Sequence, residues 1–83
     1  MKLPRDVDGD KLARSLRCYG YTIDHLTGSH QRLTAVVNGK RHVITIPLHK
    51  PLRAGTLHGI LKDVAAHQNT SLEQVIRDLF RYL

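Results

Sequence analysis

The dipeptide Asn38-Gly39 separates two runs in which apolar and polar residues alternate, residues 30–37 and 41–46. Asn-Gly between such runs is the strongest short-range signal for a β-hairpin with a two-residue type I′ turn, because both turn positions need positive φ. The turn also fixes which residues lie opposite one another. The expected pairs are Val37 with Lys40, Ala35 with His42, and Leu33 with Ile44.

The two faces of this hairpin differ in chemistry, because successive side chains of a strand point to opposite sides. One face is apolar and is predicted to be buried; it carries Leu33, Ala35, Val37, Ile44 and Ile46. The other carries His30, Arg32, Thr34, Arg41 and Thr45. His30 and Arg32 are therefore expected on the solvent side. His42 shares the buried face with Ala35 and is expected to be a packed, structural histidine.

A helix and a strand are predicted before the hairpin. The helix runs from a cap at Asp8 to Gly20, and its apolar stripe consists of Leu12, Ala13, Leu16 and Tyr19. Cys18 lies beside this stripe and is predicted to be a small buried residue. Alternation with aromatic and β-branched residues predicts a strand over Tyr21–Thr27.

Two further helices are predicted after the hairpin. The first opens at Gly55-Thr56 with Thr56 as its cap, and the second spans about residues 71–83. Ser71 with Gln74, or Thr70 with Glu73, fits a capping box for this last helix.

The predicted order is α-β-β-β-α with an extra C-terminal helix. Three antiparallel strands with helices on one face make an α+β two-layer domain. The first five elements have the order of double-stranded-RNA-binding domains, which is an analogy of fold and not of function. At 83 residues the chain has room for one core, so we expect a single domain over residues 1–83.

Charge is unevenly distributed along the chain, whose net charge is +6. No acidic residue occurs between Asp24 and Asp63, and this interval holds the bases Arg32, Lys40, Arg41, Lys50, Arg53 and Lys62. A basic middle with acidic flanks indicates a polyanionic partner such as nucleic acid, or else a solvated basic face.

Several classes of protein do not fit this sequence. A single cysteine, Cys18, excludes a scaffold held together by internal disulfides. The chain has no apolar run of the roughly 20 residues that a membrane span needs, and its first residues do not resemble a signal peptide. We therefore expect a cytoplasmic protein, and a monomer when free. The six histidines lack the spacings typical of zinc sites, so no metal and no cofactor are expected.

Two segments resemble the HicA family of toxins, in the same order and at similar spacing. The first is Gly28-Ser29-His30. The second runs Val43-Ile44-Thr45-Ile46-Pro47-Leu48-His49 and continues through Gly55-Thr56-Leu57 to Ile60-Leu61-Lys62-Asp63. Lys2-Leu3-Pro4 is also similar. The resemblance covers about residues 1–67, so these would form a HicA-like core, and residues 70–83 extend beyond it.

The resemblance implies a function. HicA proteins are toxins of toxin–antitoxin pairs that have a double-stranded-RNA-binding-like fold and cleave RNA, including messenger RNA, and a HicB-type antitoxin covers their site. The family's catalytic histidine is the one in Gly-Ser-His, which corresponds to His30. Histidine suits proton transfer because its pKa lies near working pH.

Cleavage by the RNA 2′-hydroxyl also needs other groups. Gly28 would let a phosphate approach the backbone, and Ser29 could hold its oxygens. One imidazole cannot be base and acid in one step, and the candidates for a second group are His49, Lys50 and Arg32. Lys40, Arg41 and Arg53 are candidate RNA-binding residues.

Three functions are consistent with these features. The first is a metal-independent endoribonuclease toxin acting through His30. The second is a non-catalytic RNA-binding module, which would bind RNA in a salt-sensitive way without cutting it. The third is a degenerate toxin that serves as a protein-interaction domain.

Overall fold

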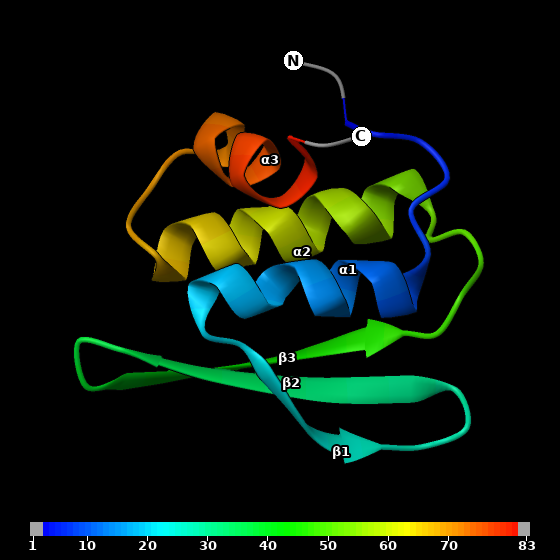
Figure 1. The fold of residues 1–83 in the computed structure, drawn as a ribbon, viewed down its shortest axis with the longest axis horizontal. Helices are drawn as coiled ribbons and strands as arrows, with labels where there is room; N and C mark the ends of the chain where they lie inside the picture. The colour runs from blue at the N-terminus through cyan, green and yellow to red at the C-terminus, as the bar shows by residue number, and fades with distance from the viewer. Residues whose placement is uncertain (1–2, 82–83) are drawn as a thin grey trace.

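The computed structural model describes residues 3–81, so the expected helix positions Tyr82 and Leu83 lie outside the described residues. The elements follow the predicted order (Figure 1). They are α1 (Gly9–Ser15), the 3₁₀ turn η1 (Leu16–Tyr19), β1 (Thr22–Leu26), β2 (His30–Val37), β3 (Lys40–Pro47), α2 (Ala54–His67) and α3 (Leu72–Phe80).

The strands form one antiparallel sheet in the order β1-β2-β3. Asn38 and Gly39 have φ of 53° and 77°, the positive values that a type I′ turn requires. All three predicted pairs across the hairpin are present, and the pairing continues without a shift to His30 opposite Pro47. The predicted faces are confirmed for most residues: Leu33, Ala35, Ile44 and Ile46 are buried, whereas His30, Arg32, Arg41 and Thr45 are exposed. Val37, expected in the core, and Thr34, expected on the open face, are both half-buried.

The first helix is shorter than predicted, because the α-helix ends at Ser15 and a 3₁₀ turn continues to Tyr19. Gly20 ends this turn with φ of 85°, as its glycine led us to expect. The prediction that Cys18 is buried was wrong: the tighter turn leaves Cys18 exposed while Leu16 is buried. Asp8 occupies the cap position without a side-chain cap bond.

The second helix begins before its predicted cap. It starts at Ala54, so Thr56 lies inside the first turn and does not cap it. Leu52, which is buried, donates its amide hydrogen to the Val7 carbonyl, and Arg53, the residue just before the helix, is extended. In α3 the predicted cap is confirmed, since the Ser71 hydroxyl accepts from the Gln74 amide.

The helices all lie on one side of the sheet, and the other side is open (Figure 1). The helices α1 and α2 pack on the sheet, and α3 packs on α2, α1 and η1. The core between these layers contains Leu12, Leu16, Tyr21, Leu33, Ile46, Leu61, Val64 and Val75, all fully buried.

A polar contact also joins α3 to the first helical segment. The Tyr19 hydroxyl donates to the Asp78 carboxylate, which also accepts from the Gln74 side chain. Burial, and then the hydrogen bond to Asp78, raise the pKa of Tyr19. The same hydrogen bond, with that from Gln74, lowers the pKa of Asp78. The last helix is therefore tied to the domain by a polar bond as well as by its apolar stripe.

Gly9 is where α1 meets the end of β3. A Cβ atom at this position would lie 2.0 Å from the Pro47 carbonyl oxygen, closer than any side chain can approach a backbone atom. The absence of a side chain therefore lets the first turn of α1 touch the sheet directly.

This approach predicts opposite effects for two glycine substitutions. Gly9→Ala is expected to destabilise the protein by at least about 1–3 kcal/mol, because backbone on both sides must move. Gly59→Ala is the control, since a Cβ there meets nothing within 4 Å. It should stabilise α2 by about 0.5–1 kcal/mol. Urea unfolding of both variants measures the difference, and a neutral Gly9→Ala would contradict the packing described.

Candidate active site

The turn that carries Gly28-Ser29-His30 connects β1 to β2 and is braced by Thr27. The Thr27 hydroxyl oxygen accepts from the backbone N–H of His30 at 3.0 Å and of Ser29 at 3.3 Å. The Thr27 amide donates to the His30 carbonyl at 2.9 Å. Although all four residues are exposed, these bonds order the backbone that presents His30.

The His30 ring is held by its neighbour. The Ser29 Oγ lies 2.8 Å from His30 Nδ1, within hydrogen-bond distance. Because this bond occupies Nδ1, the other ring nitrogen, Nε2, is left to exchange a proton with a bound molecule. Gly28 has open space around its Cα and does not have a positive φ, so neither packing nor backbone conformation requires a glycine there.

The segment after β3 lies against this turn. Leu48 donates its amide hydrogen to the Ser29 carbonyl at 2.8 Å, and His30 pairs with Pro47 in the sheet. The next residue, His49, accepts from the Gly9 amide at 3.0 Å and is exposed. His30 and His49, far apart in sequence, thus lie at the same end of the sheet, where backbone hydrogen bonds hold the segments that carry them.

Arg32 is engaged with an acid on the open face of the sheet. Its Nε donates to Asp24 Oδ1 at 2.8 Å, and the second carboxylate oxygen accepts from Thr34 at 2.5 Å and lies 3.7 Å from Arg41 Nη2. The bonds from Thr34 and Arg32 lower the pKa of Asp24. Asp24 lies where the pairing of β1 with β2 shifts by one residue, between Ile23 and His25.

The other candidate residues divide between two ends of the molecule. Lys50 and Arg53 are exposed and follow His49 on the connection to α2, at the end that holds the β1–β2 turn (Figure 1). Lys40 and Arg41 begin β3 beside the hairpin turn, at the opposite end. The six residues Gly28, Ser29, His30, His49, Lys50 and Arg53 therefore gather at one end.

A separate group of histidines lies near the hairpin end. His42 Nδ1 is 2.6 Å from the Tyr21 hydroxyl, and its ring stacks on that of His67 with centroids 4.6 Å apart. Both histidines line a hollow of about 590 Å³ together with Lys40 and Asp63. His42 is therefore the packed histidine that the strand pattern predicted, whereas its contact with His67 joins elements distant in sequence.

Among residues 3–81, no three His, Cys, Asp or Glu side chains are grouped so as to hold a metal ion.

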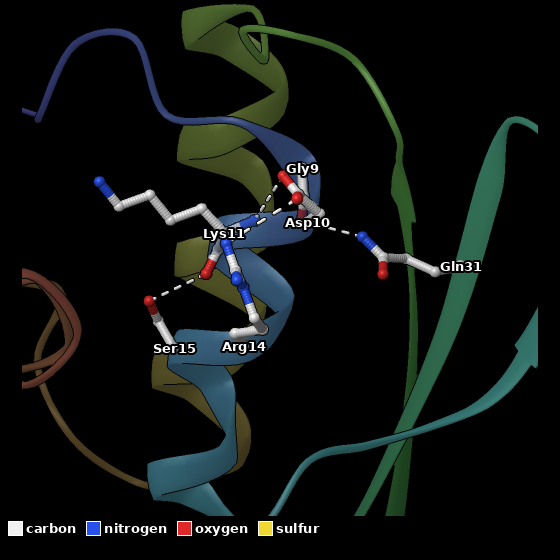
Figure 2. A network of polar contacts seen from close by, with 6 residues as sticks. All are labelled: Gly9, Asp10, Lys11, Arg14, Ser15 and Gln31. Carbon is white, nitrogen blue, oxygen red and sulfur yellow. Dashed lines mark hydrogen bonds and ion pairs between the residues drawn. The ribbon is translucent and has the colours of Figure 1, made fainter.

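Sequence reasoning missed three residues that shape the site. Thr27 braces the turn, although its position before a glycine was a weak turn signal. Gln31 is only 2% exposed, and its side-chain amide donates to the Gly9 carbonyl at 2.9 Å (Figure 2). Neither Gln31 nor Gly9 has a local pattern that predicts this contact, because it joins β2 to α1.

The fold and charge define a small, basic α+β domain whose sheet is open on one face. A family model described as the HicA toxin of bacterial toxin–antitoxin systems matches residues 9–65, more than half of the chain. The chain therefore belongs to the HicA toxin family, which supports a toxin role and implies an antitoxin partner. No curated protein and no solved structure matches the chain.

None of the helices in the described part of the chain has the length and apolar character needed to cross a bilayer.

The stacked histidines predict how stability depends on pH. Burial, and then the neighbouring His67, lower the pKa of His42, while Asp63 acts in the opposite direction. Below the ordinary histidine pKa of about 6.5, the unfolded chain binds a proton at His42 more readily than the folded chain, so stability falls as pH decreases. Urea unfolding between pH 7.5 and 5.5 should show this loss, and His42→Gln should weaken it. An equal pH dependence in both proteins would argue against His42 as its source.

Proposed function

We propose that this chain is an endoribonuclease toxin that cleaves RNA, including messenger RNA, through acid–base chemistry at His30. The observation that carries the proposal is the hydrogen bond between Ser29 Oγ and His30 Nδ1 on an ordered, exposed turn. It orients an imidazole whose Nε2 faces away from that bond. Family membership supports the same assignment.

RNA cleavage at such a site uses the nucleophile of the substrate itself. A base takes the proton of the 2′-hydroxyl, and the oxygen attacks phosphorus as the bond to the 5′-oxygen breaks. The leaving oxygen takes a proton from an acid. The products are a 2′,3′-cyclic phosphate and a 5′-hydroxyl end, and no electrons are exchanged. His30 Nε2 would carry out one of the two proton transfers, which typically contributes 10²–10⁴-fold.

His49 is the proposed partner for the other transfer. It belongs to the segment bonded to the Ser29 carbonyl through Leu48, and it is exposed. Arg32 suits this role less well, because it is bonded to Asp24 and a guanidinium does not release its proton. Lys50, also exposed, would attract the phosphate as a point charge. Arg53, Lys40 and Arg41 would bind flanking phosphates.

A HicB-type antitoxin would neutralise the toxin by covering the His30 turn. The family implies an antitoxin, and an exposed site on a chain of net charge +6 favours a partner with an acidic contact surface. No metal ion is part of the proposed chemistry, because the substrate supplies the nucleophile and histidines supply the proton transfers.

The decisive experiment is RNA cleavage by the purified protein in excess EDTA. His30→Ala should lower the rate at least about 100-fold, because it removes a proton-transfer group. His25→Ala is the matched control, an exposed histidine of β1 that should retain the wild-type rate. Circular dichroism checks that both variants are folded.

Each other result has a definite meaning. Equal cleavage by wild type and His30→Ala would remove His30 from the mechanism. RNA binding without cleavage, weakening steeply with salt, would favour the non-catalytic binding module. Antitoxin binding with neither cleavage nor RNA affinity would favour a degenerate toxin.

Gly28 provides a second prediction. Because its φ is not positive and a Cβ meets nothing within 4 Å, Gly28→Ala should leave stability unchanged or raise it by about 0.4–1 kcal/mol. The added methyl would occupy the space into which a phosphate must come, so kcat/KM should fall about tenfold or more. Thermal unfolding and cleavage assays on one preparation measure both effects. Unchanged cleavage would show that the substrate does not approach Gly28.

A further inference from the structure

Gln31 is a buried polar side chain in an apolar setting. It follows His30 in β2, lies opposite Ile46, and is 2% exposed. An apolar side chain could pack there without a hydrogen-bond partner, whereas a buried amide must be bonded to avoid a desolvation cost. The Gln31 amide meets this need by donating to the Gly9 carbonyl at 2.9 Å (Figure 2).

Gly9 is also bonded to the segment that carries His49. Its carbonyl accepts from Gln31, and its amide donates to the His49 carbonyl at 3.0 Å. The close approach of Gly9 to Pro47 leaves no room for a side chain between α1 and β3. One glycine therefore connects the residue after His30 with the backbone of His49.

A second set of hydrogen bonds joins the same two segments, through Ser29 and Leu48, and completes a closed circuit of contacts. Leu48 donates to the Ser29 carbonyl at 2.8 Å, and Ser29 bonds to the His30 ring. In addition to the pairing of His30 with Pro47, two sets of hydrogen bonds thus connect His30 with His49, one through Gln31 and Gly9, the other through Ser29 and Leu48. A closed circuit of this kind restricts relative movement far more than either set alone.

We propose that Gln31 and Gly9 are positioning residues, which hold His49 in a fixed place relative to His30 before RNA binds. The inference rests on the proposed function, because it concerns the distance between the two groups that would transfer protons. Neither residue touches the substrate. Their effect is on the chemical step, since reacting groups displaced by about 1 Å can lose about 100-fold in rate.

The test uses Gln31→Met, which keeps the length of the side chain and removes its donor. Its kcat for RNA cleavage should fall about 10- to 100-fold while KM changes less than about twofold, because a positioning defect acts on the transition state. Gln68→Met is the matched control. Gln68 also donates from its amide to a backbone carbonyl, that of Tyr19, but it lies at the end of α2. Its kcat should equal that of the wild type.

Amide hydrogen exchange tests the circuit independently of cleavage. Gly9 and Leu48 amides should exchange faster in Gln31→Met than in wild type, and equally fast in Gln68→Met and wild type. Unchanged exchange, or a folded Gln31→Met with wild-type kcat, would overturn the positioning role. A wild-type protein that does not cut RNA would instead overturn the proposed function, and the exchange result would still decide whether Gln31 holds the segment.

Gln31→Glu is the second variant should Gln31→Met fail to fold. An ionised carboxylate cannot donate to the Gly9 carbonyl, whereas a protonated carboxyl can. The ratio of its kcat to that of wild type should therefore rise as pH is lowered. A ratio that stays constant with pH would overturn the proposal.

Discussion

The positive φ angles of Asn38 and Gly39 set the register of β2 against β3, and the rest of the sheet depends on that register. Eight residues of each strand pair without interruption from this turn. A slip of one residue would move the apolar set to the open face and His30 to the core face. The turn thus determines both the burial of the sheet and the exposure of His30, although it lies at the opposite end.

The second constraint is not local. Gly9 brings the start of α1 against Pro47, and its two backbone groups bond to Gln31 and His49. Through these contacts the helical layer fixes the segment after β3, which has no regular structure of its own. The backbone at this end of the sheet is therefore held by contacts between the start of α1 and the sheet. Such an arrangement suits a site that needs fixed groups on an exposed turn.

Alternation and turn chemistry were sufficient to predict the element order, the hairpin pairs and the solvent side of His30, because each depends on residues close in sequence. The ends of elements were less predictable: α2 begins at Ala54 rather than at the expected cap Thr56, after an extended Arg53 and a Leu52 that bonds to Val7, distant in sequence. The ion pair of Arg32 could not be predicted from the sequence either. Its bond to Asp24 arises at a shift in the β1–β2 pairing, which no periodic pattern reveals.

The basic middle of the chain is less uniform in space than in sequence. Arg32 and Arg41 share the Asp24 carboxylate on the open face, so part of their charge is already compensated. Lys50 and Arg53 lie near His49, at the end with the His30 turn. Two bases of this interval thus lie beside the ordered histidine, and the acids Asp8 and Asp10 flank Gly9, which bonds to His49, at the same end. Under the proposed function, Lys50 and Arg53 would draw RNA to this end, and the bonded backbone of the His30 turn, more than net charge, would decide which phosphate reaches His30.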